Sequence, residues 1–458
     1  MTTTPIEIDS ETSRVLLTLV NSGRYSFAEA GKKFANSGLS LFLASEAADT
    51  PAGQAAFLTA TVTAVRCFGK GKVSVHGQVD RPLLLPLPLP ASNLAAAAYE
   101  LGAVVGDPFP NRAVLIGPVL NHRSTWSVQA FWDGWVAGVT PGRTPRANGR
   151  SDCLLAGVAA GALAIGQAFM AEQDHAEAGR IPQTLSLWSP DSTLYDPGPP
   201  QSQCYLPLQL WLIGLGNLGQ AFLWSLSMLP YPTPNNVLLF LQDDDIVKEE
   251  NWATSILVRR GRYGPLKTRI AEEWAEARGF CVRRIDRRFD ETLRRTDQEP
   301  LLALAGLDSM RPRRWLGLPK FEYVIDAGLG ATAANFQKIR INVFDTADSK
   351  MNPCQHFEDD EDATATTTTR LMELPAYQEI VRNNEEGRCG AAILAGSSVA
   401  VPFVSAFAGA LAITQAVRVA SGEAHHSTVT GDVSNCIVRA TVGQRPTRPA
   451  IPSVLAAS

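Results

Sequence analysis

The chain has 458 residues, which is more than one hydrophobic core ordinarily holds, so two domains are expected. Its formal net charge is −4 at pH 7, which indicates no general polyanion-binding surface and argues against a nucleic-acid partner. Seven cysteines, at positions 67, 153, 204, 281, 354, 389 and 436, form no Cys-x-x-Cys pair, and no charged-then-apolar leader opens the sequence. We therefore expect a cytoplasmic protein without a structural zinc site.

The apolar pattern of residues 1–195 predicts an α/β domain. Strands are expected at residues 57–67, 73–75 and 113–116, and a helix is expected at residues 94–101. The proline-rich run 81–90 indicates a loop or an extended edge. A second proline-rich run, 190–207, contains the expected linker, residues 196–206.

Two long apolar stretches, residues 153–170 and 399–420, have the length of membrane spans. Both are dominated by alanine and glycine, and each contains a glutamine, so we expect buried helices and no membrane. They also share an octamer: residues 161–168 match residues 409–416 at every position except Gly166 against Thr414. Such an alanine-rich match can arise by chance, and the alternative is a duplicated domain.

A glycine-rich turn begins the second half. Gly214, Gly216 and Gly219 form a Gly-x-Gly-x-x-Gly pattern between an apolar strand run, residues 210–213, and a helical run, residues 218–229. Backbone N–H groups in such a strand-turn-helix face phosphate, so the pattern predicts a nucleotide site.

Acidic residues follow the next strand run. Asp243 comes after residues 237–241, where a carboxylate can accept hydrogen bonds from ribose hydroxyls, and Asp245 and Asn251 lie just beyond it. Up to this point an NAD site fits equally well. Lys267, behind a Gly-Pro pair that can open a helix, is not called for by a dinucleotide site and suits the phosphates of ATP.

Taken together, this set resembles the adenylation domain of the ubiquitin-activating and ThiF-like superfamily. The resemblance implies a Rossmann-like, doubly wound domain at residues 207–440, with the glycines as phosphate loop, Asp243 as ribose-binding acid and Lys267 as a phosphate-binding, catalytic lysine. It implies ATP and Mg²⁺ as cofactors, with Asp245 and Asn251 in the nucleotide pocket. The strand run 323–326 ends in Asp326, which resembles the Mg²⁺-associated acid of the family.

The family arginine that follows the asparagine is missing here. Thr254 stands in its place, and Arg259, Arg260 or Arg262 is expected to supply the charge instead. Some members of the superfamily pair an inactive adenylation fold with an active one. Residues 1–195 lack the glycine turn but share the octamer, so the resemblance implies a degenerate, inactive domain there.

The segment 345–388 changes character and resembles the crossover loop of the family. Its acidic run, residues 358–362, and the alanine- and threonine-rich run after it have no helical or strand periodicity, which is typical of a solvated surface loop. The functional interpretation is a loop that orders over the carrier tail. Cys389 follows it at the position of the reactive cysteine of many members, and a small buried cysteine is the alternative interpretation for it. Cys354, which lies within the segment, is the second candidate.

The expected function is ATP-dependent activation of a ubiquitin-like protein. The enzyme would adenylate the C-terminal glycine of the carrier, form a thioester on Cys389 and pass the carrier to a conjugating enzyme, as in the activating enzymes of bacterial ubiquitin-like conjugation operons. Alternatives are a sulfur-carrier adenylyltransferase without an enzyme thioester, an NAD- or FAD-dependent oxidoreductase, and a nucleotide-binding scaffold without turnover. A homodimer is possible, and residues 441–458 are expected to form a flexible tail.

Overall fold

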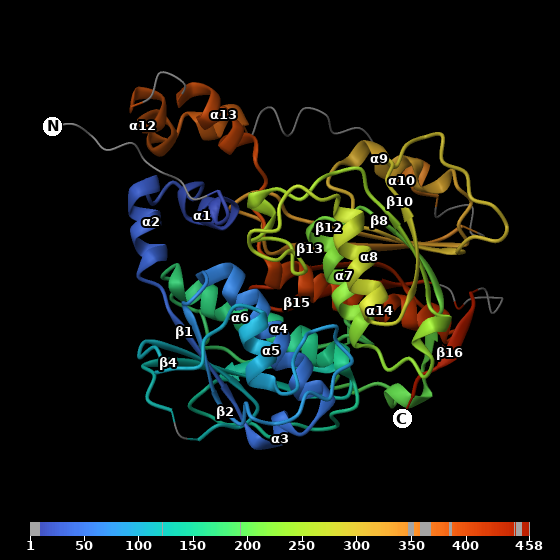
Figure 1. Ribbon diagram of the computed structural model, residues 1–458, viewed down its shortest axis with the longest axis horizontal. Helices are drawn as coiled ribbons and strands as arrows, with labels where there is room; N and C mark the ends of the chain where they lie inside the picture. The colour runs from blue at the N-terminus through green and yellow to red at the C-terminus, as the bar shows by residue number, and fades with distance from the viewer. Residues whose placement is uncertain are drawn as a thin grey trace.

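The computed structural model describes residues 10–120, 122–192, 194–346, 352–357, 368–383, 387–443, 445 and 451–457. For residues 383, 387–390 and 393 it describes the backbone alone. Two large sheets, one in each half of the chain, are joined by helices that lie side by side through the middle of the molecule (Figure 1).

The first half holds a six-stranded sheet in the order β2-β1-β3-β4-β5-β6. Its strands are β1 (Leu39–Leu43), β2 (Val73–Gly77), β3 (Arg112–Ile116), β4 (Trp126–Asp133), β5 (Val136–Pro141) and β6 (Gln183–Ser186). Its helices are α1 (Ser13–Val20), α2 (Phe27–Ala35), α3 (Ser45–Ala48), α4 (Pro51–Phe68), α5 (Leu94–Glu100) and α6 (Leu154–Glu172).

The second half holds an eight-stranded sheet in the order β10-β9-β8-β11-β12-β13-β14-β15. Its strands are β8 (Gln209–Ile213), β9 (Leu238–Gln242), β10 (Cys281–Ile285), β11 (Leu302–Ala305), β12 (Tyr323–Leu329), β13 (Lys338–Asp345), β14 (His426–Asp432) and β15 (Ile437–Val442). Its main helices are α7 (Asn217–Met228), α8 (Lys267–Ala277), α9 (Met310–Arg314), α10 (Pro353–His356), α12 (Pro375–Asn383), α13 (Gly387–Gly396) and α14 (Pro402–Ala420).

The six strands of the first sheet have the same topology as six neighbouring strands of the second. Reading β2-β1-β3-β4-β5-β6 against β9-β8-β11-β12-β13-β14, each pair of neighbours has the same direction: three parallel contacts are followed by two antiparallel ones. The helices also correspond, since α4 follows β1 as α7 follows β8, and α6 follows β5 as α14 follows β13. The predicted fold class, a doubly wound α/β domain preceded by a second domain of the same kind, is confirmed.

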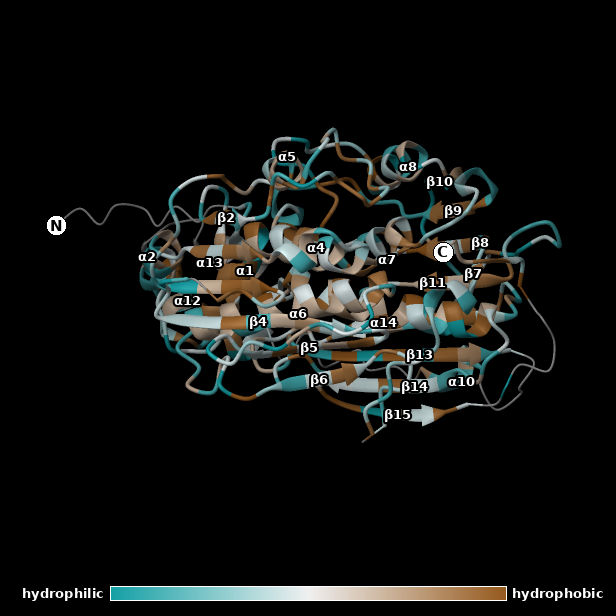
Figure 2. Cartoon of the chain, turned by 90° about the horizontal axis from the view of Figure 1, so that it is seen from below, coloured by the Kyte–Doolittle hydropathy of each residue, from teal (hydrophilic) through white to brown (hydrophobic). Residues whose placement is uncertain are grey.

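The repeated octamers occupy equivalent places in this pair of folds. One lies in α6 and the other in α14, and these two helices pack against each other. A side chain at Gly161 would overlap the backbone carbonyl of Ala56 in α4, and one at Gly409 would come within 2.9 Å of the carbonyl oxygen of Ala221 in α7. Figure 2 shows α4, α6, α14 and α7 side by side, so the predicted pseudo-symmetric packing through the octamer helices is confirmed.

Helices α6 and α14 are the two described helices that are long and apolar enough to cross a membrane. Their most apolar windows are 89% and 94% buried inside the protein, because each helix lies between a sheet and neighbouring helices. The expectation of buried core helices is therefore correct.

Two expectations from the sequence differ from the structure. Residues 57–67 form part of α4, because a helix buried on every side shows no amphipathic periodicity, and its start is marked by the Thr50 cap and Pro51. The expected flexible tail is partly ordered: β15 extends to Val442, and β16 (Ser453–Leu455) pairs antiparallel with β7 (Tyr205–Pro207) of the expected linker.

The glycine contact between α4 and α6 predicts a stability difference that depends on position. Gly161→Ala should lower the free energy of unfolding by about 1–3 kcal/mol, because the new methyl group forces two packed backbones apart. The control is Gly31→Ala in α2, where a Cβ meets no atom within 4 Å, so stability should stay the same or rise slightly. Denaturant unfolding of both variants measures the difference. Equal stability of the two variants would contradict this account of the helix contact.

Candidate functional site

Each glycine of the predicted phosphate loop meets a different steric requirement. Gly214 has φ of +81°, which favours glycine, and Gly219 lies so close to the carbonyl of Gly214 that any side chain would overlap it. Gly216 precedes α7, and a Cβ there would meet no atom within 4 Å. The loop therefore leaves open space at the start of a helix, where a phosphate can approach backbone N–H groups.

Asp243 directly follows β9, the strand next to β8, and its carboxylate contacts this loop. One carboxylate oxygen accepts a hydrogen bond from the backbone N–H of Leu215 at 2.6 Å, and the other accepts one from the N–H of Asp245 at 2.8 Å. Burial raises the pKa of the Asp243 carboxyl, and the charge of Lys267 and both hydrogen bonds oppose that shift. The carboxylate thus lies between the glycine loop and the lysine.

Lys267 is the first residue of α8 and lies beside the acidic segment. Its Nζ is 2.6 Å from Oδ2 of Asp245, and its backbone N–H donates to the carbonyl of the same residue at 2.9 Å. The Lys267 side chain is 13% exposed and the Asp245 side chain is 65% exposed. The ammonium is therefore largely covered, while the carboxylate that holds it faces solvent. This ion pair lowers the pKa of Asp245.

Asn251 has a local structural contact. Its Oδ1 accepts a hydrogen bond from the backbone N–H of Lys248 at 2.8 Å, which fixes the short turn after Asp245. The structure therefore brings Gly214, Gly216, Gly219, Asp243, Asp245 and Lys267 together, with Asn251 on the turn that borders them.

Asp326, the predicted metal-associated acid, is fully buried in β12. Its Oδ2 lies 2.9 Å from Nη1 of Arg313, and the same guanidinium donates to the carbonyls of Leu307 and Ala327. Burial raises the pKa of the Asp326 carboxyl, and Arg313 opposes the shift. The cation disfavours a metal ion at Oδ2, whereas Oδ1 is buried and has no hydrogen-bond partner among the described residues.

The sequence interpretation missed an acid just after the strand that lies beside the phosphate loop. Strand β11 pairs with β8, and a Cβ at Gly214 would lie 2.9 Å from the carbonyl oxygen of Gly306. Two residues later Asp308 is exposed. An acid shortly after a strand is the signal that identified Asp243, and the same signal could have found Asp308.

Two of the three arginines expected to replace the family arginine pair with other residues. Arg260 pairs with Glu11, and Arg262 lies 2.6 Å from Glu273. Thr254 is buried, and Arg259 is exposed. A further arginine comes from the first half: Arg14 in α1 lies 3.8 Å from Glu250, next to Asn251.

The two candidate cysteines lie in different surroundings. Cys354, in α10, is exposed, and its Sγ lies 2.9 Å from the carbonyl oxygen of Arg314. Cys389 is the third residue of α13, and its side chain lies outside the described residues. The acidic run 358–362 is also outside them.

Helix α13 follows α12, which contacts the α1–α2 region of the first half (Figure 1). The ring of Tyr377 meets Phe27 edge-on at 5.3 Å between centroids, and its hydroxyl donates to Asn21 at 2.6 Å. This contact, which the sequence did not suggest, brings the segment that contains Cys389 next to α1 and α2.

The first half has no equivalent of the phosphate loop. After β1 the chain turns through the short helix α3 into α4. The third glycine alone is kept: Gly53 lies against the carbonyl of Ala47 as Gly219 lies against that of Gly214, each as the third residue of its helix.

Comparisons with known proteins give a consistent family. Residues 38–187 match the BilD N-terminal domain, and residues 206–423 match the BilD C-terminal domain. The bacterial E1-like protein BilD of Collimonas sp. (strain OK412) is 33% identical over 410 residues, which cover 87% of this chain and 86% of the relative.

Solved structures resemble the chain only in part. Escherichia coli MccB with MccA has 12% identity and a TM-score of 0.35 over 54% of this chain and 66% of that one, which is just under two thirds. E. coli MccB with ATP has 11% identity and a TM-score of 0.35 over 55% of this chain and 68% of that one. PaaA has 13% identity and a TM-score of 0.34 over 51% of this chain and 63% of that one.

The alignment with this relative covers most of both sequences. The two domain families match the two halves of the chain, each with its own sheet, in the order in which they occur. This chain belongs to the BilD family of bacterial E1-like proteins.

Proposed function

We propose that the chain adenylates the C-terminal glycine of a ubiquitin-like protein with ATP and Mg²⁺. The observation that carries this proposal is the position of Lys267. It is paired with Asp245, and its charge opposes the rise that burial causes in the pKa of Asp243, the residue that binds the glycine loop. An NAD site needs the loop and the acid, but it has no use for a lysine held there. Membership of an E1-like family gives the same direction.

The residues of the site divide the work. N–H groups of the loop around Gly216 would hold phosphate oxygens, and Asp243 would hold the ribose after exchanging its backbone partners. The carrier carboxylate attacks the α-phosphorus, an acyl adenylate forms, and pyrophosphate leaves. Lys267, freed from Asp245, would stabilise the charge that develops on the departing phosphates.

Mg²⁺ would supply further charge neutralisation on the phosphates. Asp308 suits this ion better than Asp326, because it is exposed and follows the strand next to the loop, whereas Asp326 is paired with Arg313. Asp326 would hold α9 in place through that arginine. Arg14 is the best-placed substitute for the missing family arginine, since it lies beside the turn at Asn251.

The second proposed step is thioester formation on Cys389. Its thiolate attacks the acyl carbon of the adenylate, the C–S bond forms, and AMP leaves with the bonding electrons of the C–O bond. A cysteine in the first turn of a helix has N–H groups nearby that favour the thiolate. The carrier would then pass to the cysteine of a conjugating enzyme.

Other parts of the proposal concern context. A cytoplasmic location agrees with the described cysteines, which are all free thiols. A sulfur-carrier adenylyltransferase without an enzyme thioester remains the nearest alternative, because it needs the same adenylation site. A homodimer and the operon setting of the conjugating enzyme are proposals from the family resemblance.

Lys267→Ala should reduce carrier-dependent ATP–pyrophosphate exchange by at least about 10²-fold, because a preorganised charge at the leaving phosphates is lost. The matched control is Lys32→Ala, on the exposed side of α2 in the first half, which should keep wild-type exchange. Circular dichroism of both variants should be unchanged. Exchange within a few-fold of wild type in the Lys267 variant would refute the role of this lysine.

Cys389→Ala should keep pyrophosphate exchange but lose the reducing-agent-sensitive adduct between enzyme and carrier on a non-reducing gel, because adenylation and thiol transfer use different groups. Cys354→Ala is the control and should retain the adduct. An adduct that disappears in the Cys354 variant alone identifies Cys354 as the nucleophile. If both variants keep transfer to the downstream protein, the enzyme stops at the acyl adenylate.

A further inference from the structure

A cavity of about 300 Å³ lies at the seam between the two halves. Its walls come from α4 and the turn after α5 on one side, and from α7, α8 and the segment after Asn251 on the other. Neither the phosphate loop nor Lys267 lines it, so this cavity is separate from the proposed adenylation site.

Arg66 is the buried charge of this seam cavity. The residue is only 6% exposed, and its Nη2 donates to the carbonyls of Ile256 at 3.3 Å and Val258 at 2.6 Å. Its Nε is buried and has no hydrogen-bond partner among the described residues. Burial lowers the pKa of Arg66 to about 10, and the carboxylate that acts on it from a distance, Glu11, is itself paired with Arg260. Two carbonyls solvate this guanidinium, but within the described ranges of the chain no anion pairs directly with its charge.

The surroundings of the cavity are cationic and aromatic. Four cations line it, Arg66, Lys70, Arg259 and Arg260, against the carboxylate of Glu100, and Arg260 is already paired with Glu11, which leaves two positive charges in excess. Lys70 and Arg259 are exposed at its mouth. The indoles of Trp224, Trp252 and Trp274 form part of the wall, and Arg66 stacks over Trp252 at 4.8 Å.

We propose that the seam cavity is a second ligand site and that it takes a small aromatic anion. A flat ring would pack against the indole wall, and a carboxylate would pair with Arg66 in the interior and with Lys70 and Arg259 at the mouth. The volume is at the small end of ligand pockets, which suits one ring system and is tight for a nucleoside triphosphate.

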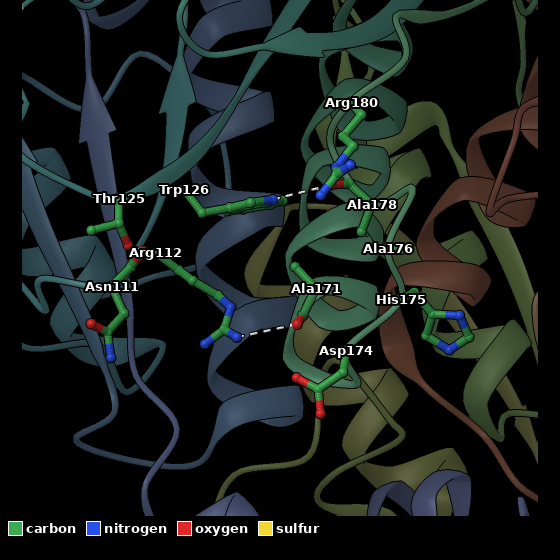
Figure 3. A pocket seen from close by; sticks show the side chains of 10 residues that line it. All are labelled: Asn111, Arg112, Thr125, Trp126, Ala171, Asp174, His175, Ala176, Ala178 and Arg180. Atoms are coloured by element: carbon green, nitrogen blue, oxygen red, sulfur yellow. Dashed lines mark hydrogen bonds between the residues drawn. The ribbon is translucent and has the colours of Figure 1, made fainter.

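A second pocket, in the first half, gives a comparison (Figure 3). Its volume is about 390 Å³, and two of its charged lining residues, Arg112 and Asp174, are already paired. Arg112 binds Glu172 at 2.6 Å, and Asp174 accepts from Lys33 at 2.7 Å and from Tyr25 at 3.1 Å. This pocket offers a control position, the exposed Arg180.

The seam cavity is connected to the phosphate loop by two hydrogen bonds. The backbone N–H of Leu257, a wall residue, donates to Oε1 of Gln220 at 2.9 Å, and Nε2 of Gln220 donates to the carbonyl of Leu215 at 3.1 Å. A ligand that fixes the Leu257 segment should therefore change nucleotide affinity. This coupling rests on the proposed function, whereas the ligand site itself does not.

The test is calorimetric titration of the intact, nucleotide-free protein with 2-naphthoate and with 2-naphthamide, which match in shape and differ in charge. Naphthoate should bind one site per chain at least about tenfold more tightly than the amide, because only the anion forms charge-assisted hydrogen bonds. Arg66→Met should remove that preference. The double variant Lys70→Glu, Arg259→Glu, in which the buried Arg66 is intact, should lower the affinity for naphthoate at least about fivefold. Arg180→Glu should have no effect.

Equal affinity for the two probes, or unchanged naphthoate affinity in the Lys70→Glu, Arg259→Glu variant, would overturn the site. Coupling is measured as the change in ATP affinity at saturating naphthoate, and by reciprocity ATP must change naphthoate affinity by the same factor. Naphthoate binding without any such change refutes the coupling and keeps the site. Loss of ATP binding under all conditions would instead count against the proposed function.

Discussion

The close contact between central helices is the constraint on which the rest of the structure depends. At Gly157 and Gly161 in α6, and at Gly409 in α14, backbone meets backbone, because any side chain there would overlap or crowd a carbonyl of the facing helix. Small residues therefore bring α6 close to α4 in the first half and α14 close to α7 in the second, and α6 packs on α14 where the two halves meet. Glycine lowers the intrinsic stability of a helix, so its use here reflects the need for closeness.

The packing of α6 on α14 places the first half beside the proposed nucleotide site. Helix α1 and the residues before it reach the turn beyond Asp245: Ser10 hydrogen-bonds Glu249, Arg14 faces Glu250, and Glu11 meets Arg260 and Tyr263. The first half thus borders the proposed site of the second, although its own loop is replaced by α3. A duplicated domain can lose its ligand and still be required, because its surface has become part of its partner's site.

The sequence predicted the parts of the site that are local. Gly214, Gly216 and Gly219 act within one turn, and Asp243 ends the next strand, so spacing along the chain was sufficient to place them together. Asp326 shows the limit of this reasoning. It also ends an apolar run, but its carboxylate is paired with Arg313, whose approach from α9 cannot be read from strand periodicity.

Elements buried on all sides were equally hard to predict. Helix α4 was interpreted as a strand because residues 52–68 are all buried, and uniform burial removes the alternation between apolar and polar positions that distinguishes helix from strand. The repeat gave better information, since matching octamers imply matching surroundings whatever their periodicity. The contact of Tyr377 with α1 and α2 joins residues more than three hundred positions apart, and no local pattern indicates it.

The pairing of β16 with β7 has a consequence for motion. Residues 205–207, which connect the halves, are held in a two-stranded sheet by residues 453–455, and Tyr231 also hydrogen-bonds the carbonyl of Pro207. A connection anchored in this way is a poor hinge, because bending it breaks ladder hydrogen bonds on both strands. For the proposed thioester step, we therefore expect a rearrangement that carries Cys389 to the adenylate to pivot within the second half, between β13 and α14, with residues 205–207 kept in place.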